Sequence, residues 1–532
     1  MNRTRYNRWI SVFILLSLPV LSVLTLFKSV RTPTVYAASF IVSNPADSGT
    51  GTLRQALANQ SAGLVITFDP AVFPPGAPTT VMVQSALPTV VQNGLIIDAS
   101  NAGVVLNGSL ASAGTNGLTW TADNGAIRGL RIDSFSGNGI ELLSGASSNT
   151  IGGSTGGGSA LLGQGNLITR NGASGIAIHG AGTNNNVVHG NYIGLDASGL
   201  WDWGNGTNGV SIWEGASSNT VGDTAVDRRN VISGNTHNGV WLHGATTTGN
   251  QVKGNLIGVG ANGQSSVANS LAGVSLQGGA HHNDIGGTVV GAGNLISGNS
   301  SSGIYLGDTG TANNHILGNI IGLNAAGTAV IGQGYHGILL TGGASSNQIG
   351  NGSAAGRNVI SGNSISGIRL EGSATTGNII QGNYMGSSVN GLAALPNGMH
   401  GAEITLGAHS NQIGGNRLAG QGNLLSGNTN HGLVLAEEAH HNTVQGNLIG
   451  PNVTGMVSLG NQPYGGMDIT NGAHDNIIGG AGTGEGNIIS GNSTDGVALF
   501  DNNGATTTDN QLLYNWIGLA VDGQTPLHND GP

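Results

Sequence analysis

The chain has 532 residues, of which 97 are glycine, 38% are hydrophobic and only 8% are charged. So much glycine disfavours helices, while the amount and regular spacing of hydrophobic residues exclude a disordered linker. The formal charge of −10 argues against nucleic acid as a partner, and the lack of cysteine excludes disulfides, thiol catalysis and thiolate metal sites.

Residues 1–37 are predicted to be a signal peptide. Arginines precede an apolar run from Trp9 to Phe27, and small residues stand near Ala37, where a signal peptidase would cut. An uncleaved membrane anchor is the alternative, although Pro19 interrupts the run. Cleavage would change the charge from −10 to −15, because the segment holds five basic residues and no acid. We expect a secreted protein, extracellular or at the cell surface, that touches a membrane only if this segment is retained.

Residues 38–117 are predicted to form an N-terminal capping region and the first coils of the fold. The stretch "DSGTGTLRQALANQ" (residues 47–60) reads as a short helix, with Thr52 as the N-cap and Gln55 as its capping-box partner. We expect this helix to cover the open end of the fold, where unpaired strand edges would otherwise invite aggregation.

Residues 118–532 are predicted to be repeats, because three sequence markers share one period. "NVISGN" and its variants begin at residues 166, 230, 294, 358, 423 and 487. The Asn of "GNxIG" stands at 191, 255, 319, 383 and 447, and that of "NxIG" or "NxVG" at 219, 283, 347, 411 and 476. The numbers of successive copies differ by 64 or 65, so the period describes how the chain is wound.

Short segments between the markers alternate apolar and variable residues, as strands do. In "GVWLHG", Val240 and Leu242 would face one side and Trp241 and His243 the other. We predict an all-β, single-stranded parallel β-helix (β-solenoid) with about 21 residues per coil, so that three coils make the 64-residue super-repeat. Residues 64 apart would then lie three coils, or roughly 14 Å, from each other.

These Gly- and Asn-rich repeats, from about Gly125 to Gly518, resemble the right-handed parallel β-helix repeat family, which has the pectin-lyase-like fold. Residues 47–60 also resemble the SLR(E/Q)A-type motif that precedes such β-helices, with Thr52 in place of Ser. The resemblance implies the fold and its handedness. It implies no single activity, because the fold hosts lyases, hydrolases, epimerases, adhesins and structural spikes.

The repeated asparagines and histidines are predicted to be structural. Asn residues in fixed register beside Gly favour hydrogen-bonded ladders along the stack over ligand-binding amides. The pairs His281/His282 and His440/His441 stand where other repeats have Ser, at exposed turns, so we predict no metal site. No cofactor is identified, and Ca²⁺ is expected only if the protein is a lyase.

Exposed aromatic residues suggest a glycan-binding surface. Four of the seven tryptophans fall between residues 192 and 243. Aromatic rings on a rigid wall suit the apolar faces of sugar rings. The alternative for the first two tryptophans is a loop that covers the wall. The candidate glycan-binding residues are Trp201, Trp203, Trp213, Trp241, Tyr305 and Arg369.

Carboxylates in the same stretch are the candidates for catalysis. The spacing of Asp202 and Asp223 equals one coil of the predicted length, which would place them on neighbouring strands at the separation that glycoside hydrolysis needs. The candidate catalytic residues are Asp202, Glu214, Asp223, Arg228 and Arg229. The acid and base sets of polyuronate lyases are not recognisable, and Lys253 is the only lysine after the signal segment.

We therefore predict an exported β-helix protein that presents a repetitive surface for binding extracellular or cell-surface polysaccharide. A polysaccharide-degrading enzyme of the same fold, either a glycoside hydrolase or a lyase, is one alternative. A structural or adhesive surface spike is the other.

Overall fold

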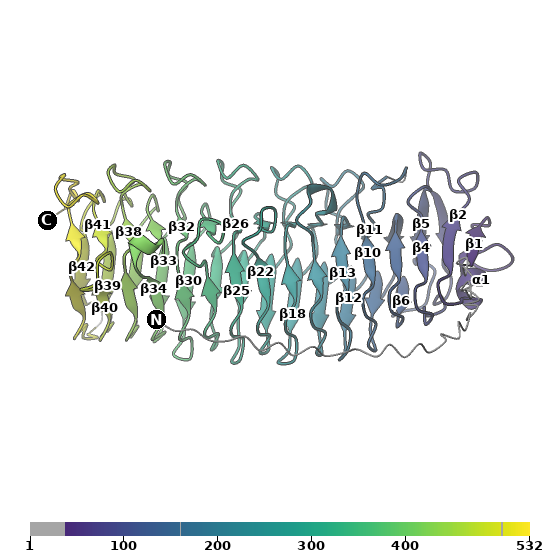
Figure 1. Ribbon diagram of the computed structural model, residues 1–532, viewed down its shortest axis with the longest axis horizontal. Helices are drawn as coiled ribbons and strands as arrows, with labels where there is room; N and C mark the ends of the chain where they lie inside the picture. The colour runs from purple at the N-terminus through teal and green to yellow at the C-terminus, as the bar shows by residue number, and fades with distance from the viewer. Residues whose placement is uncertain (1–37, 160, 502–503, 532) are drawn as a thin grey trace, which may run out of the picture. The chain divides into compact units, whose positions relative to one another are not determined.

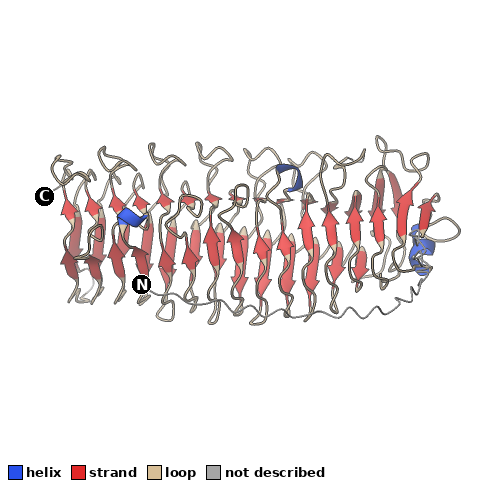
Figure 2. Ribbon diagram, in the orientation of Figure 1, coloured by secondary structure: helices blue, strands red, loops and turns tan. Residues whose placement is uncertain are grey.

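Short parallel strands, stacked in register, build almost the whole molecule. The computed structural model describes residues 38–159, 161–501 and 504–531. Within these residues the chain builds three parallel sheets, here called sheets A, B and C, and from β4 onward each full coil gives one strand to each of them (Figures 1 and 2). The predicted parallel β-helix is confirmed, and the three long sheets are consistent with a right-handed one.

The strands and helices have the following bounds. Sheet A contains β1 (Ser39–Val42), β2 (Val65–Phe68), β4 (Ile96–Asp98), β7 (Ala126–Arg128), β10 (Thr150–Gly152), β13 (Val187–His189), β16 (Thr220–Val221), β19 (Gln251–Val252), β22 (Asp284–Gly286), β25 (His315–Leu317), β28 (Gln348–Ile349), β31 (Ile379–Ile380), β34 (Gln412–Gly414), β37 (Thr443–Gln445), β40 (Ile477–Gly479) and β43 (Gln511–Leu513). Sheet B contains β3 (Thr79–Met82), β5 (Val104–Asn107), β8 (Leu130–Asp133), β11 (Leu167–Thr169), β14 (Tyr192–Ile193), β17 (Val231–Ile232), β20 (Leu256–Ile257), β23 (Leu295–Ile296), β26 (Ile320–Ile321), β29 (Val359–Ile360), β32 (Tyr384–Met385), β35 (Leu424–Leu425), β38 (Leu448–Ile449), β41 (Ile488–Ile489) and β44 (Trp516–Ile517). Sheet C contains β6 (Leu118–Trp120), β9 (Ile140–Leu142), β12 (Ile176–His179), β15 (Val210–Trp213), β18 (Val240–His243), β21 (Val274–Gln277), β24 (Ile304–Leu306), β27 (Ile338–Leu340), β30 (Ile368–Glu371), β33 (Ala402–Thr405), β36 (Leu433–Leu435), β39 (Met467–Thr470) and β42 (Val497–Phe500). The helical segments are α1 (Leu53–Ala58) and the 3-10 turns η1 (Val226–Arg228) and η2 (Arg417–Ala419).

The coil is longer than predicted. In sheet C, Val210 pairs with Val240 and Val240 pairs with Val274, and each of these pairings marks one full coil. Two coils therefore take the chain from Val210 to Val274, which is one whole period, and the prediction of three shorter coils is wrong. The prediction assigned about 21 residues to a coil, whereas a real coil is longer because it carries three strands, one for each sheet. Residues 64 apart lie two coils, or about 9.6 Å, from each other.

The repeated asparagines form buried ladders, as predicted. The amide Nδ2 of Asn230 donates to Oδ1 of Asn255 at 2.9 Å, Asn255 donates to Asn294 at 3.0 Å, and Asn294 donates to Asn319 at 2.9 Å. Asn230 belongs to "NVISGN" and Asn255 to "GNxIG". The two markers therefore supply the same ladder on alternate coils, which satisfies buried polar groups at every turn of the stack.

Alternation along each strand separates the core from the surface. Val240 and Leu242 are fully buried inside the solenoid, whereas Trp241 and His243 face outward and are partly exposed, as predicted. In "NVISGN", Ile232 enters the core, while Val231 packs outside sheet B in a second apolar cluster. Because the inner wall is continuous, the outer side chains are held on a rigid support.

Helix α1 begins after Thr52, as predicted, and lies beside β1 at the N-terminal end of the stack (Figure 1). The Thr52 hydroxyl accepts a hydrogen bond from the Gln55 amide at 3.2 Å, and the Gln55 side chain accepts one from the Gly51 amide at 2.7 Å. The buried side of α1 packs Leu53 and Leu57 against the core. No helix among the described residues is long and apolar enough to cross a membrane.

Candidate functional site

The outward side of sheet C carries two columns of side chains, and together they are called face C below. Strand pairing aligns the members of each column on successive coils. The first column contains Glu141, Ala177, Ser211, Trp241, Ser275, Tyr305, Leu339, Arg369, Glu403, Val434 and Asp468. The second contains His179, Trp213, His243, Gln277, Glu371 and Thr405. Trp241, Tyr305 and Arg369 thus share one column, and Trp213 lies in the other.

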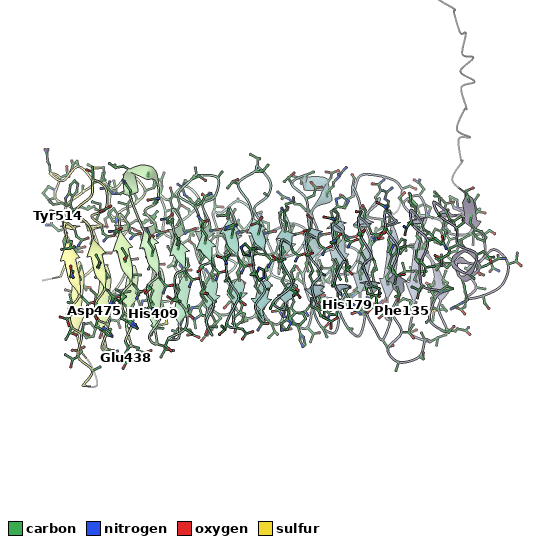
Figure 3. All side chains as sticks on the ribbon, turned by 60° about the horizontal axis from the view of Figure 1, so that its bottom comes forward. Phe135, His179, His409, Glu438, Asp475 and Tyr514 are labelled. Atoms are coloured by element: carbon green, nitrogen blue, oxygen red, sulfur yellow. The ribbon has the colours of Figure 1, made fainter. Side chains whose placement is uncertain are left out.

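Two tryptophans stand side by side at one end of face C. The ring of Trp213 stacks on His179 at a centroid distance of 4.3 Å, and the ring of Trp241 lies 4.7 Å from that of His243. The two indoles are 6.4 Å apart and tilted by 38°. The indole N–H of Trp241 donates to Gln277 at 3.0 Å, which fixes the ring on the sheet. Figure 3 labels His179 at this end of the molecule.

A shallow hollow of about 420 Å³ opens beside these two rings. Besides Trp213 and Trp241, polar side chains line most of it, including Thr207, Asn208 and His237. The amide of Asn208 donates to the Ser211 hydroxyl at 3.1 Å, and the amide of Asn238 donates to Asn208 at 3.0 Å. The hollow therefore combines flat apolar surfaces with hydrogen-bonding groups held in place.

Trp201 and Trp203 lie on another side of the solenoid. Both belong to the loop between β14 of sheet B and β15 of sheet C. The guanidinium groups of Arg170 and Arg131 lie 4.4 Å and 5.0 Å from the Trp203 ring centroid, and both arginines bond to the buried Asp133. Trp203 thus covers sheet B, while Trp201 is 71% exposed at the loop. Neither joins the tryptophans of face C.

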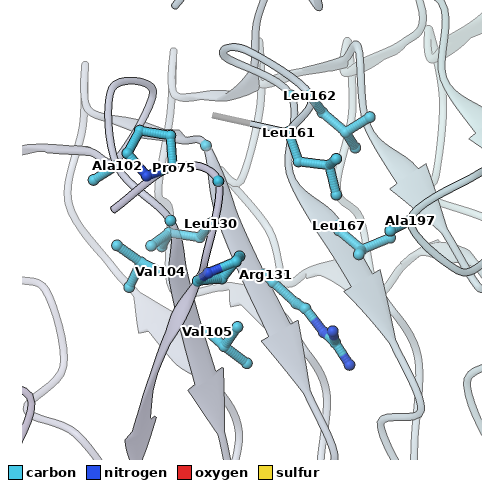
Figure 4. A pocket seen from close by; sticks show the side chains of 15 residues that line it. Pro75, Ala102, Val104, Val105, Leu130, Arg131, Leu161, Leu162, Leu167 and Ala197 are labelled. Atoms are coloured by element: carbon cyan, nitrogen blue, oxygen red, sulfur yellow. The ribbon is translucent and has the colours of Figure 1, made fainter. Parts of the chain in front are cut away.

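The same region of sheet B contains an apolar hollow of about 350 Å³ (Figure 4). Leu130, Leu167 and the exposed Leu161 line it, with Arg131 at its edge. Arg131 is the only polar side chain among the residues that line it, whereas hydroxyl and amide side chains line the hollow of face C.

The predicted pairing of Asp202 with Asp223 is wrong. Asp202 lies in the loop from sheet B to sheet C, Glu214 in the turn from sheet C to sheet A, and Asp223 in the loop from sheet A to sheet B. The three carboxylates therefore occupy three different corners of one coil. Their spacing matched a coil of the predicted length, but the real coil is longer and carries them around its circumference.

Asp223 lies close to Arg228 and His189. Arg228, in η1, lies 3.7 Å from Asp223, and His189 lies 3.4 Å from the same carboxylate. Burial opposes ionisation of Asp223, yet hydrogen bonds from the Ala225 amide and His189 outweigh it and lower its pKa. Arg229 follows η1 in the same loop. Of the five candidates, Glu214 borders face C, at 3.4 Å from His179.

The far end of face C holds a charged cluster that the sequence analysis missed, apart from Arg369. This guanidinium donates to Glu371 at 2.6 Å and to Glu403 at 2.9 Å. The Ser366 hydroxyl also donates to Glu403, at 3.2 Å. Two coils beyond Glu403, Asp468 pairs with the imidazole Nε2 of His431 at 3.1 Å. Arg369 was the feature of the sequence that could have revealed this cluster, because Glu403 is its neighbour in the column on the next coil.

Burial sets the charge state of this cluster. It lowers the pKa of His336 to about 4 and that of His431 to about 4. Burial, helped by the charges of His431 and Arg369, lowers the pKa of His400 to about 3. Burial and then the charge of Asp495 raise the pKa of Asp468 to about 6. The imidazoles are therefore neutral near pH 7, and Asp468 holds its proton in mildly acidic solution.

The histidine pairs lie in turns, as the sequence indicated. His281 aligns with Thr248, and His409, His440 and His474 align on three successive coils. Their rings stack at 4.8 Å and 4.9 Å. Among the described residues, no group of three or more His, Asp or Glu side chains is arranged to hold a metal ion.

Comparisons with known proteins find similarity only among solved structures. No family model and no curated protein matches the chain. The Dettilon tailspike protein aligns with a TM-score of 0.38 and 15% identity over 87% of this chain and 68% of that one. The A-module of the Azotobacter vinelandii mannuronan C-5 epimerase AlgE6 gives 0.39 and 12% over 88% and 97%. The PL6 family polysaccharide lyase Pedsa3628 of Pseudopedobacter saltans gives 0.39 and 13% over 92% and 95%. Such distant similarities do not decide what the protein does, and its own strand pairing establishes the fold.

Proposed function

We propose that face C binds a polysaccharide, with Trp213 and Trp241 as the surfaces on which sugar rings stack. The observation that carries the proposal is the pair of adjacent, partly exposed indoles beside a hollow lined by polar side chains. A sugar ring has an apolar face rimmed by hydroxyl groups, so it needs a flat ring below and hydrogen-bonding groups at the side. Thr207, His237 and Gln277, which are at least partly exposed, supply those groups.

The shape of face C favours a polymer over a single sugar. Its columns run along the stack with about 4.8 Å between coils, and Tyr305 lies two coils beyond Trp241 in the same column. The backbone ladders and asparagine ladders hold every coil in register, so little ordering is required when a ligand binds. A chain of repeated sugar units could thus contact successive coils with the same geometry.

The proposal includes export of the protein. Its basis is the apolar segment in residues 1–37, which lies outside the described residues. An extracellular or cell-surface protein would meet polysaccharide directly, and a β-helix without cysteine keeps its structure there through stacking alone.

Binding to a panel of soluble and insoluble polysaccharides tests the proposal. We expect the Trp213→Ala, Trp241→Ala double variant to bind at least tenfold more weakly, because each lost indole should remove about 1 kcal/mol or more of stacking free energy. Trp201→Ala is the matched control, since it removes an exposed indole from the same coil but from a different side. Failure of the wild-type protein to bind any polysaccharide, or equal loss in the control, would refute the proposal and favour a purely structural or adhesive role.

A further inference from the structure

Two carboxylates face outward from the charged end of face C. Glu403 and Asp468 occupy the same column, two coils apart, with Val434 between them. Their backbone positions are therefore separated by about 9.6 Å. Glycosidases that invert the anomeric centre place their two carboxyl groups about 6.5 to 9.5 Å apart, so that a water molecule fits between one carboxylate and the sugar.

The two carboxyl groups have different surroundings. Glu403 receives hydrogen bonds from the Arg369 guanidinium on one oxygen and from the Ser366 hydroxyl on the other, an arrangement that suits a carboxylate anion. Asp468 has the imidazole of His431 as its partner, and its pKa is raised to about 6. The pKa of Glu403 is also raised, because burial outweighs the opposing effects of Arg369 and Ser366. The two groups thus differ in their partners, a guanidinium and a hydroxyl for Glu403 and an imidazole for Asp468, and acid–base catalysis assigns its two roles to groups in such different environments.

Unpaired polar atoms accompany the two carboxyl groups. Within the described part of the chain, the imidazole nitrogens Nε2 of His336, Nδ1 of His400 and Nδ1 of His431 are buried without a hydrogen-bond partner. The Ser366 amide donates to Nδ1 of His336 at 3.2 Å, so the proton of that ring resides on the unpaired Nε2. Buried polar atoms are normally paired, and groups left unpaired indicate a place that water or a ligand completes.

Exposed tyrosines stand near the cluster, Tyr335 one coil before Arg369 and Tyr464 on the coil of Asp468. Tyr335 is 42% exposed and its ring lies 4.3 Å from that of His336, while Tyr464 is 55% exposed and lies 5.5 Å from His431. They precede β27 and β39, which are four coils, or about 19 Å, apart. Sugar rings stacked on the two tyrosines would hold the chain over Glu403 and beside Asp468.

We infer that this end of face C hydrolyses glycosidic bonds of the polysaccharide, with Asp468 as the general acid and Glu403 as the general base. Protonated Asp468 gives its proton to the glycosidic oxygen as the bond from that oxygen to the anomeric carbon breaks. Glu403 takes a proton from a water molecule as the water oxygen bonds to the anomeric carbon from the opposite side. One water is consumed, and a new reducing end with inverted configuration forms. The inference rests on the proposed binding function.

The charges of the cluster favour hydrolysis over elimination. A lyase acting on an acidic sugar must neutralise the carboxylate of its substrate before a proton can leave the neighbouring carbon. Arg369 is already bonded to two carboxylates, and Lys253 lies beside sheet A, on another side of the solenoid. The site therefore suits a neutral segment of the polysaccharide.

The test uses the full mature chain on every polysaccharide that it is found to bind. Reducing ends are measured over time, and the configuration of the first product is read by NMR. We expect Glu403→Gln and Asp468→Asn each to lower turnover at least 100-fold while binding changes less than threefold. Glu438→Gln is the control, because Glu438 is an exposed carboxylate in the turn after β36 at the same end of the molecule (Figure 3). Wild-type turnover should fall as the pH rises above about 6, where Asp468 loses its proton.

This experiment distinguishes a failure of the hydrolysis proposal from a failure of the binding proposal. Polysaccharide binding without new reducing ends would overturn the hydrolysis and leave the binding function intact. Unsaturated products, retained configuration, or full activity in both Glu403→Gln and Asp468→Asn would also overturn it. Thermal unfolding of each variant, compared with Glu438→Gln, shows whether a loss of turnover reflects chemistry or misfolding.

Discussion

The asparagine ladders give the sharpest test of how the solenoid is held together. In the middle of one ladder, Asn319 Nδ2 donates to the Ile285 carbonyl at 2.9 Å and to Asn358 Oδ1 at 3.0 Å. Its Oδ1 accepts from the backbone amide of Asn294 at 3.1 Å and from the Asn294 side chain at 2.9 Å. Replacement by alanine removes all four bonds at a site that has no solvent access.

The cost of Asn319→Ala follows from that count. Each buried hydrogen bond contributes about 1 kcal/mol net, and a buried donor left without a partner costs about 1 to 3 kcal/mol. The Asn294 backbone amide is such a donor after the substitution. We therefore expect the free energy of unfolding to fall by about 4 to 6 kcal/mol.

Urea unfolding, followed by circular dichroism, measures this change. Asn515→Ala is the control: Asn515 occupies the same ladder on the last described coil, accepts two bonds from Asn487, and is only partly buried. Water can replace its lost bonds, so its effect should be about 1 to 2 kcal/mol. A loss below about 1 kcal/mol for Asn319→Ala, or equal losses for the two variants, would show that the ladders do not hold the coils together.

Two further predictions concern acid stability and processing. Because burial lowers the pKa of His336, His400 and His431 to between about 3 and 4, the unfolded chain binds protons that the folded chain does not, and stability should fall as the pH drops from about 6.5 toward 4. The raised pKa values of Asp468 and Glu403 act in the opposite direction, but they are two groups against three. Urea midpoints between pH 7.5 and 4.5 measure how stability depends on pH, and His400→Gln should weaken that dependence. An unchanged dependence would contradict the assignment of acid sensitivity to the buried imidazoles. N-terminal sequencing of protein from the culture medium should find a mature chain that starts near Ala38, whereas a chain that stays with the membrane and keeps residues 1–37 would contradict cleavage.

The fold could be predicted from the sequence, but the length of its coil could not. Regular Gly and Asn markers, alternating strands and the capping box of α1 each reflect local chemistry, and each was found in the structure. The coil length depends on which markers stack on each other. Asn230 and Asn255 stand in different sequence motifs, yet they occupy equivalent positions of one ladder on successive coils. A pattern search treats such motifs as different features, although the structure uses them for the same purpose.

The wrong coil length explains which parts of the candidate site could be predicted and which could not. Residues one full period apart share a column whatever the coil length, so Trp241, Tyr305 and Arg369 lie in one column, whereas Trp213 lies in the other. Residues offset by a single real coil were not compared, because the shorter predicted coil gives them no shared column. Glu403 pairs with Arg369 from the next coil and lies directly beside it, and Asp468 follows two coils later in the same column. With two coils in each period, the tryptophans and the two carboxylates lie along one continuous face, where a bound chain could reach both.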